Sequence, residues 1–492
     1  MKLAASRSLE EQLTMNSPGS NQNLATDIVV IGSGPGGYVA AIRLGQLGKS
    51  VTIVEKDKIG GVCLNVGCIP SKALITAGKL AKNARNASKM GIDASISVNM
   101  TRLQEWKQTV VQRLTSGVSV LLKTYKVRVL EGNAKFLSGK SLSVESSSNQ
   151  ITHLNFNQAI IATGSSPIEI PSAKFDGKRI ISSTEALSLS EPPKRLLIVG
   201  GGVIGLEIGM AYANLFGAEL MIVELLDQLL PGVDLELVNV VSRSLQKLNA
   251  KIYLKSKVKG AVATSEGAKV TFETPEGKEI TTEVDHVLVS VGRRPNSSSI
   301  GLEKAGVDID SKGFIKVNKQ MSTSAPNIFA IGDVVGGPLL AHKASREGIV
   351  AAEVISGMNS SFDNVAIPSV IFTDPEIAIV GMSPAEVSSK GIISRTGKFP
   401  FVANGRALSS LETEGFTKIL AEKESGLLLG VGIVGQEASD LISETTLAIE
   451  MGATLEDLAL TIHPHPTLPE TIMEAAENAL GRAIHITNRP VS

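Results

Sequence analysis

The sequence predicts an α/β protein of several domains, in which one βαβ pattern occurs twice and a mixed α+β region follows. The chain has 492 residues, which at about 150 residues per domain corresponds to about three domains. A pattern of strand, glycine turn, helix and strand occurs near residue 27 and again near residue 195, and it does not recur after Ala366. Lys+Arg and Asp+Glu both total 48, so the net charge is zero, which disfavours a nucleic acid or a membrane surface as partner.

The first 24 residues are predicted to form a flexible leader before the first domain. Residues 16–23 are rich in Ser, Asn, Gly and Pro, a composition typical of chain without regular structure. The leader lacks the apolar run of a signal peptide, and Glu10 and Glu11 argue against a transit peptide. No stretch approaches the ~18–20 unbroken apolar residues of a membrane span. We therefore expect a cytoplasmic protein.

The first βαβ pattern begins at Asp27 with a β-branched strand and ends at Glu55, after an Ala-rich helix and a second strand. Three glycines between the first strand and the helix have the spacing Gly-x-Gly-x-x-Gly: Gly32, Gly34 and Gly37. Glycines in this turn let the backbone approach a pyrophosphate at the helix N-terminus, and the terminal acid accepts hydrogen bonds from ribose hydroxyls. The pattern therefore predicts a Rossmann-like dinucleotide site.

The second βαβ pattern begins at Arg195 and repeats the first in nearly constant register. Its glycine turn has the same spacing, with Gly200, Gly202 and Gly205, and its second strand ends at Glu224. A glutamate at that position repels a 2′-phosphate, so Glu224 favours NAD over NADP. The chain is thus expected to bind two dinucleotides.

The regions between and after these patterns predict where the chain crosses between domains. Residues 159–162 form a buried strand that ends in the turn Thr163-Gly164-Ser165, and residues 287–291 followed by Gly292 repeat this form. The expected division is a first domain over residues 25–165, a second over 166–290, a return to the first over 291–365 and a third domain over 366–492.

Asp333 follows another short strand, at residues 328–331, and precedes the segment Leu340-Ala341-His342. An acid at this place fits a helix N-cap or turn, and it fits a cofactor ligand equally well. The pattern alone leaves both interpretations open.

The two cysteines of the chain are Cys63 and Cys68. They could be inert small hydrophobic residues or half of a zinc site, but the further ligands of a zinc site are missing. A redox disulfide remains, although residues five apart in a regular helix are too distant for one. Gly67 and Pro70 predict the necessary distortion, and a helix resuming after Pro70 would place Lys72 on the same face as Cys68 and favour its thiolate.

Two histidines lie close to the C-terminus, in the sequence His463-Pro-His465-Pro-Thr-Leu-Pro-Glu470. The prolines are typical of a stiffened turn, in which these side chains would be structural. A redox disulfide that reacts with a dithiol also needs a base, because thiols with a pKa near ~8.5 are mostly protonated at neutral pH. Histidine is suited to that task.

The run Gly-Gly-Val-Cys63-Leu-Asn-Val-Gly-Cys68-Ile-Pro-Ser-Lys72 resembles the signature of the pyridine nucleotide disulfide oxidoreductases, and the resemblance extends over about residues 26–485. Within the family, the chain most resembles the members that oxidise dihydrolipoamide for 2-oxo acid dehydrogenase complexes and reduce NAD+. The resemblance implies two Rossmann-like dinucleotide-binding domains, one for FAD and one for NAD, and a C-terminal α+β dimerisation domain. It implies a homodimer that serves the lipoyl domains and core acyltransferase of those complexes.

The resemblance also assigns roles to the redox residues. Cys68 is expected to face the flavin as the charge-transfer thiolate, and Cys63 to exchange with the dithiol substrate. Lys72 matches a lysine beside the flavin, and Glu207 matches its ion-pair partner. His465 corresponds to the catalytic base, which acts on the other subunit's disulfide. Glu470 corresponds to the residue that orients this base.

The resemblance implies two sets of cofactor residues. Those expected at FAD are Gly32, Gly34, Gly37, Glu55, Lys72, Ala134, Thr163, Gly164, Ser165, Asp333, Leu340, Ala341 and His342. Those expected at NAD are Gly200, Gly202, Gly205, Glu207, Glu224, Val258 and Gly292.

Other members of the family and a protein without redox activity are the alternatives. Glutathione reductases carry basic residues where this chain has Glu224, and mercuric and large thioredoxin reductases need a C-terminal redox pair that this sequence lacks. A redox-dead flavoprotein scaffold would not need the complete set of Cys63, Cys68, His465 and Glu470. Dithiol oxidation is therefore the expected function.

Overall fold

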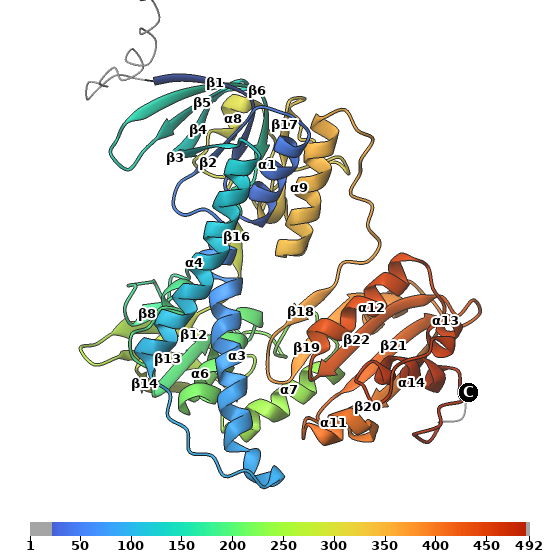
Figure 1. The fold of residues 1–492 in the computed structure, drawn as a ribbon. Helices are drawn as coiled ribbons and strands as arrows, with labels where there is room; N and C mark the ends of the chain where they lie inside the picture. The colour runs from blue at the N-terminus through green and yellow to red at the C-terminus, as the bar shows by residue number, and fades with distance from the viewer. Residues whose placement is uncertain (1–21, 489–492) are drawn as a thin grey trace, which may run out of the picture. The chain divides into compact units, whose positions relative to one another are not determined.

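The computed structural model describes residues 22–488, which divide into two compact units (Figure 1). The first unit contains residues 22–61, Val118–Gly164 and Pro295–Phe362. The second contains Val62–Gly117, Ser165–Arg294 and residues 363–488. Residues 1–21 of the expected leader lie outside the described residues, and the first strand begins at Gln22.

The first unit is built on a seven-stranded sheet in the order β3-β2-β1-β6-β5-β4, with β17 also paired to β6. Strands β1, β2, β3, β6 and β17 are parallel to one another, and the start of β6 also pairs with β5, which forms an antiparallel meander with β4 and β6. The elements are β1 (Gln22–Ile31), α1 (Pro35–Gln46), β2 (Val51–Glu55), β3 (Arg128–Glu131), β4 (Asn133–Ser138), β5 (Ser141–Glu145), β6 (Ile151–Ile161), α8 (Leu302–Ala305), β17 (Ile328–Ala330), η2 (Gly332–Val335) and α9 (Ala341–Ile355).

The local sequence explains why the first βαβ unit forms. All five residues of β2 are buried, as expected of a strand in a parallel sheet that is covered on both faces. Helix α1 begins with Pro35, whose fixed φ suits the first helical turn. Helix α9 packs against α1 (Figure 1), and the approach is close because Gly36 faces the backbone of Ala344 on α9 and Gly348 faces the backbone of Gly36.

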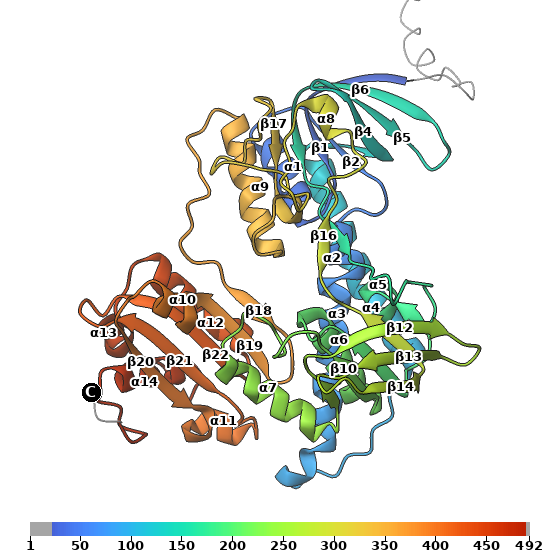
Figure 2. The ribbon, with the colours of Figure 1, turned by 180° about the vertical axis from the view of Figure 1, so that it is seen from behind.

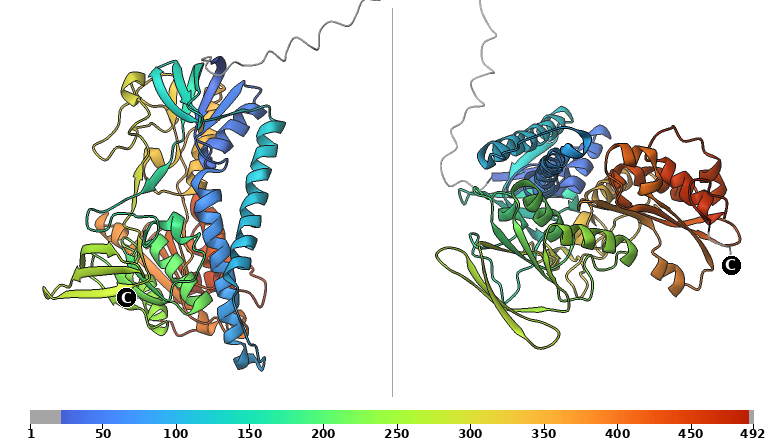
Figure 3. Two further views of the ribbon diagram at one scale, coloured as in Figure 1. Left: turned by 90° about the vertical axis from the view of Figure 1, so that its left-hand side faces the viewer. Right: turned by 90° about the horizontal axis from the view of Figure 1, so that it is seen from below.

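The second unit contains a parallel sheet in the order β11-β10-β9-β15-β8 and a three-stranded antiparallel sheet, β12-β13-β14, drawn in yellow-green in Figure 3. Phe272 and Val258 join the two sheets in one buried core. The elements are β7 (Ser165–Pro167), β8 (Ile180–Ile181), α5 (Ser183–Ala186), β9 (Arg195–Val199), α6 (Val203–Phe216), β10 (Glu219–Val223), α7 (Leu235–Lys247), β11 (Lys251–Tyr253), β12 (Lys257–Ala263), β13 (Ala268–Glu273), β14 (Glu279–Val284), β15 (His286–Val289) and β16 (Arg293–Pro295).

The C-terminal part of the second unit is an antiparallel sheet in the order β18-β19-β22-β21-β20, covered by helices α12 and α14 (Figure 2). Lys418 on this sheet is buried and binds both Asp234 and Glu236 at the start of α7. The elements are β18 (Ser369–Ile371), β19 (Glu376–Gly381), α10 (Pro384–Ser389), β20 (Ser394–Pro400), η3 (Phe401–Ala403), α11 (Gly405–Ser409), β21 (Phe416–Glu422), β22 (Leu428–Gly435), α12 (Ala438–Glu450), α13 (Leu455–Leu460) and α14 (Glu470–Ala479).

Three further helices precede these sheets in the chain: α2 (Gly61–Val66), α3 (Cys68–Arg85) and α4 (Met100–Thr124), with the short η1 (Ala87–Met90) between the last two. Helix α3 packs against α6 in the second unit. By length and composition alone, one helical stretch of the described chain, Gly61–Arg85, would pass as a membrane span. This is weak evidence, because core helices of water-soluble proteins pass the same test.

Candidate functional site

The two cysteines lie on either side of a break between α2 and α3. Gly67 forms the break, with φ −137° and ψ −112°, and a Cβ on it would lie 2.9 Å from the carbonyl oxygen of Val62. The expectation that a helix resumes after Pro70 was wrong, because α3 already begins at Cys68. A proline in the first helical turn removes no helical hydrogen bond, so Pro70 does not delay the helix.

The two thiols interact with each other and titrate in opposite directions. The hydrogen bond from Cys63 is the main factor that lowers the pKa of Cys68 to about 7, and the charge of Lys72 acts in the same direction. The same hydrogen bond, together with burial, raises the pKa of Cys63. When the reduced pair loses a proton near neutral pH, the negative charge is therefore on Cys68. The thiolate is the form of cysteine that reacts.

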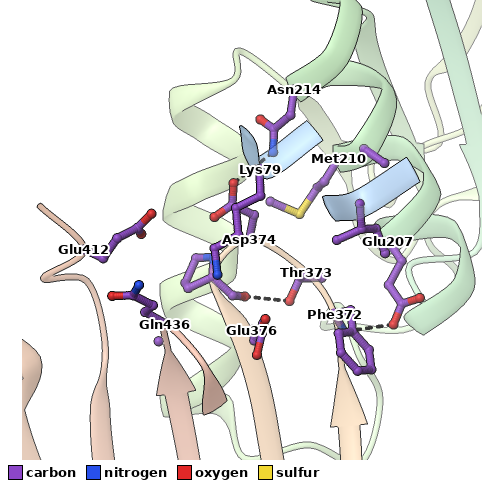
Figure 4. A pocket seen from close by; sticks show the side chains of 14 residues that line it. Lys79, Glu207, Met210, Asn214, Phe372, Thr373, Asp374, Glu376, Glu412 and Gln436 are labelled. Atoms are coloured by element: carbon purple, nitrogen blue, oxygen red, sulfur yellow. Dashed lines mark hydrogen bonds between the residues drawn. The ribbon is translucent and has the colours of Figure 1, made fainter. Parts of the chain in front are cut away.

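Lys72, one helical turn after Cys68, forms an ion pair with Glu207 on α6 at 2.9 Å. The second carboxylate oxygen of Glu207 accepts the N–H of Phe372 at 2.8 Å, shown as a dashed line in Figure 4. The ammonium of Lys72 also lies 4.3 Å from the centre of the Phe372 ring. Glu207 thus joins the redox helix to the C-terminal sheet, and the family resemblance implied only its ion pair with Lys72.

A small cavity of about 30 Å³ lies next to Glu207 (Figure 4), and both charged and apolar residues line it. That volume is enough for one or two water molecules. Burial raises the pKa of two carboxyl groups at its wall, Glu376 and Glu412. Lys79 pairs with Glu437 at 2.9 Å near the same wall. Nothing in the local sequence predicted this cavity, because its lining comes from segments far apart in the chain.

The first glycine turn has the geometry that a dinucleotide requires. A Cβ on Gly32 or Gly37 would collide with neighbouring backbone, and Gly32 has a φ of +100°. A Cβ on Gly34 would meet open space, so this residue leaves room for a ligand at the N-terminus of α1. Glu55 accepts the backbone N–H and the hydroxyl of Ser33 at 2.8 and 2.6 Å, which fixes the turn.

The remaining residues expected at FAD lie in several environments. Asp333 is on η2, and Leu340, Ala341 and His342 start α9, all in the first unit. Ala134 is buried in the core of that unit, so only its backbone can contact a ligand. Thr163 and Gly164 bind the Asn296 backbone, whereas Ser165, in the second unit, binds Arg293. The first-unit residues fit FAD because they combine the glycine turn before α1, the carboxylate of Asp333 and the N-terminus of a helix.

The second glycine turn borders a cavity of about 670 Å³ in the second unit. This volume is within the ~300–1,000 Å³ typical of cofactor pockets. Five of the residues expected at NAD line it: Gly200, Gly202, Glu224, Val258 and Gly292. Lys257 and Arg293 also line it and were missed from the sequence. Two cations at the wall suit the phosphates of a dinucleotide.

Glu224, Gly205 and Glu207 serve the second βαβ unit differently. Glu224 is buried and accepts the backbone N–H groups of Gly201 and Leu226, one on each oxygen. Each carboxylate oxygen retains a second acceptor position for a ribose hydroxyl. Gly205 and Glu207 are not in the cavity lining: a Cβ on Gly205 would collide with Ser290, and Glu207 faces Lys72.

His465 and Glu470 form a hydrogen-bonded pair at the start of α14. The Nδ1 atom of His465 lies 2.8 Å from Glu470 Oε1, and Glu470 Oε2 accepts the N–H of Thr467 at 2.7 Å. Burial opposes ionisation of Glu470, yet these hydrogen bonds hold its pKa below the ordinary value. Because an ionised carboxylate only accepts, the proton is on Nδ1, and Nε2 of the exposed ring is available as a base.

His463 has a separate structural environment that the sequence did not predict. Its Nε2 lies 2.8 Å from Glu444 on α12, and its Nδ1 lies 2.8 Å from the carbonyl oxygen of Thr461. The hydrogen bond to Glu444 is the main cause of its raised pKa. With an acceptor at each nitrogen, the doubly protonated ring is favoured, so His463 is a poor candidate for a base.

Comparison with protein families matches residues 26–348 to the pyridine nucleotide-disulphide oxidoreductases and residues 367–476 to the dimerisation domain of that family. The dihydrolipoyl dehydrogenase of Bacillus subtilis (strain 168) is 51% identical over 465 residues, which cover 94% of this chain and 98% of that protein. That of Geobacillus stearothermophilus is 50% identical over 467 residues, covering 95% and 98%. The chain belongs to the pyridine nucleotide-disulphide oxidoreductases, among the dihydrolipoyl dehydrogenases.

Solved structures of the family have the same fold. LpdA from Mycobacterium tuberculosis matches with a TM-score of 0.85 and 28% identity, over 92% of this chain and 99% of that one. RclA, an HOCl-induced flavoprotein disulfide reductase from Escherichia coli, matches with a TM-score of 0.82 and 25% identity, over the same shares. The expected family and fold class are confirmed. This family member is an NAD-dependent oxidoreductase with FAD and NAD as cofactors and a C-terminal dimerisation domain.

Proposed function

We propose that Cys63, Cys68 and His465 carry out the dihydrolipoyl dehydrogenase reaction of this chain, which oxidises a dihydrolipoyl dithiol to the cyclic disulfide and reduces NAD+ to NADH. The thiol pair is the observation that carries the proposal, because it combines a Cys68 pKa of about 7 with a raised pKa on Cys63. The two sulfurs thereby have different tasks. A redox-dead scaffold and other disulfide reductases are not favoured, since relatives at about half identity over nearly the whole chain are dihydrolipoyl dehydrogenases.

The reaction begins with attack of a substrate thiolate on the sulfur of Cys63. The Cys63–Cys68 bond breaks, and Cys68 leaves as the thiolate, which its low pKa makes a good leaving group. The second substrate thiolate then displaces Cys63, which takes a proton in keeping with its raised pKa. The substrate departs as a disulfide, and the enzyme holds two electrons as its reduced thiol pair. FAD, held by the first glycine turn and the Asp333 loop, would supply a two-electron acceptor able to return hydride to NAD+.

His465 acts as the base that removes the protons of the substrate thiols. Its Nε2 is the accepting atom, and Glu470 holds the ring by Nδ1 and stabilises the cation that forms. Lys72 stabilises the Cys68 thiolate, and Glu207 holds Lys72 in place. In the second unit, Glu224 selects NAD+ by accepting from the ribose hydroxyls and repelling a 2′-phosphate.

The working enzyme is a homodimer in which each site takes its disulfide from one chain and its base from the other. Exposed apolar side chains beside His463 support a subunit interface there: Leu447, Met451, Leu460 and Ile462 are exposed by 63%, 76%, 74% and 94%. Large exposed apolar groups of this kind are typical of protein–protein surfaces. The physiological partners are the lipoyl domains and core acyltransferase of 2-oxo acid dehydrogenase complexes. The enzyme works in the cytoplasm, in keeping with cysteines used only as a redox pair.

The test is dihydrolipoamide oxidation, followed as NADH formation, in the wild type and in His465→Gln. Loss of a general base typically costs about 10²–10⁴ in rate, so the variant should lose that factor. Reduction of artificial acceptors by NADH should persist, because it needs no dithiol base. His153→Gln, which changes a histidine on β6, is the matched control and should behave as wild type. Wild-type protein without dihydrolipoamide turnover would overturn the proposed function.

The subunit arrangement is tested with mixed dimers of Cys68→Ser and His465→Gln chains. If disulfide and base come from different chains, each mixed dimer contains one intact site and one site that lacks both groups. It should recover about half of the wild-type activity, whereas each parent dimer is inactive. Inactive mixed dimers of verified composition would show that both groups of a site come from one chain.

A further inference from the structure

A buried ion pair at the start of α9 has no role in the steps above. Lys343 and Glu347 are one helical turn apart, with Nζ and Oε1 separated by 2.7 Å, and their side chains are only 6% and 3% exposed. Buried lysine and glutamate are rare unless they are paired and serve a purpose, since both lose their hydration. The pair therefore needs an explanation beyond helix stability.

Glu347 binds the segment that carries Asp333. Its second oxygen, Oε2, accepts the backbone N–H of Gly332 at 2.7 Å. Gly332 has a φ of +76°, a conformation that residues other than glycine rarely adopt, and Asp333 follows it directly. The hydrogen bond thus fixes the peptide from which the Asp333 side chain projects.

The end of the Lys343 side chain lies against the loop between η2 and α9. A Cβ on Gly337, in that loop, would lie 3.4 Å from its Cε atom. An ammonium has three donors. Within residues 22–488, Glu347 is its ion-pair partner, and its remaining donors have no hydrogen-bond acceptor. These buried donors without an acceptor lie directly beside the residues expected at FAD.

The same helix also contacts the first glycine turn. The built Cβ of Gly36 would lie 3.1 Å from the carbonyl oxygen of Ala344, and that of Gly348 would lie 2.6 Å from the oxygen of Gly36. One end of α9 therefore holds two parts of the dinucleotide site within the first unit: the turn at the N-terminus of α1, and the loop of Asp333.

We propose that Lys343 and Glu347 are positioning residues for FAD: Glu347 orients Asp333 through Gly332, and Lys343 keeps Glu347 ionised and supplies positive charge to the loop. The inference rests on the flavin-dependent function proposed above and adds two residues to its cofactor site. It requires no direct contact between Glu347 and FAD.

The burial of the Lys343–Glu347 pair explains why variants should bind FAD more weakly. Without the Lys343 ammonium, Glu347 would be a buried carboxylate close to Asp333, and burial already raises its pKa. It would then take up a proton or turn away, and a neutral acid is a weaker acceptor for the Gly332 N–H. The Asp333 loop would lose its fixed geometry, and FAD affinity would fall.

The experiment measures the FAD dissociation constant of the full-length protein, from the fluorescence of released flavin, together with its melting temperature. Lys343→Met should weaken FAD binding by about tenfold or more, as expected for loss of a hydrogen bond to a charged group. Lys343→Arg should retain FAD binding within about threefold, since the charge and donors remain. The matched control is Glu353→Gln on the same helix, which breaks an ion pair with Arg43 away from the loop and should leave FAD affinity unchanged.

Glu347→Gln is the second test, and it covers the case in which Lys343→Met does not fold. A glutamine cannot neutralise Lys343 while it accepts from Gly332, so FAD binding should again weaken by about tenfold. The inference is overturned if either variant lowers the melting temperature but binds FAD as tightly as Glu353→Gln. These measurements are independent of dihydrolipoamide turnover, so an enzyme that binds FAD and does not oxidise dihydrolipoamide would refute the proposed function alone.

Discussion

Glu470→Gln is a sharp test of how the proposed base is held. Glu470 accepts two hydrogen bonds, one from His465 Nδ1 and one from the Thr467 backbone N–H, through different oxygens. Glutamine has the same shape, but it offers one acceptor oxygen and one donor amide. With the proton on Nδ1 of His465, one of the two donors faces another donor in either orientation of the amide. Moving the proton to Nε2 would restore the hydrogen bond but remove the basic atom. The variant therefore loses either a hydrogen bond or the base, together with the negative charge beside the ring.

The size of the effect follows from the strength and exposure of this contact. A hydrogen bond to a charged group contributes about 1.5–3 kcal/mol. The His465 side chain is 79% exposed in the single chain, so water can replace part of the lost interaction, and the lower end applies. Since about 1.4 kcal/mol corresponds to a factor of ten, we expect kcat/KM for dihydrolipoamide to fall by about tenfold. His465→Gln, which removes the base itself, should cost far more.

The assay is steady-state oxidation of dihydrolipoamide across a pH series, with NADH-dependent reduction of an artificial acceptor as the internal control. The loss should be confined to the dithiol reaction. Glu470→Ala should be at least as impaired, because it orients neither Thr467 nor the ring. Glu470→Gln with wild-type kcat/KM would refute the reasoning, and so would an equal loss of the acceptor reaction, which would indicate a general structural defect.

Three further outcomes are expected. In Cys63→Ser, the serine hydroxyl still donates to Cys68, so a long-wavelength flavin–thiolate absorbance should be present without reductant and grow as pH rises through about 7; absorbance that does not vary with pH would contradict this. Glu224→Arg should reduce the preference for NAD+ over NADP+ in kcat/KM while FAD stays bound, and an unchanged ratio would count against the assignment. The raised pKa of His463 means that its pairing with Glu444 stabilises the fold fully at pH values below the ordinary histidine pKa, and that this stabilisation is lost as pH rises through the raised pKa. The melting temperature of Glu444→Gln should lack this pH dependence. A variant with the same pH profile as the wild type would contradict the stabilising role of the pair.

The parts of the molecule that sequence could predict are those governed by local backbone constraints. Gly32 and Gly200 occupy equivalent turns with φ of +100° and +98°, which residues other than glycine rarely adopt. The glycine pattern in the sequence therefore predicts both turns without a structure. The buried strands before them are apolar runs for the same local reason. The pairing of His465 with Glu470 came from the family resemblance and not from their spacing, and the structure places the two side chains in contact.

The parts that sequence could not predict depend on residues brought together by folding. His463 was indistinguishable from a turn residue until Glu444, on another helix, came within 2.8 Å. The start of α3 at Cys68 was misplaced, because Pro70 was taken as an interruption and not as part of a first turn. The contact of Glu347 with Gly332 is also invisible locally, since any surface helix can carry a lysine and a glutamate four residues apart.

Glu207 has a consequence for any attempt to adjust the redox chemistry by mutation. One of its oxygens holds the lysine that stabilises the thiolate, and the other holds Phe372 at the end of a strand in the dimerisation domain. A substitution made to change the potential of the cysteine pair would at the same time release an anchor of the domain that carries His465. A change at this position would therefore alter the charge next to the cysteine pair and the attachment of the dimerisation domain together.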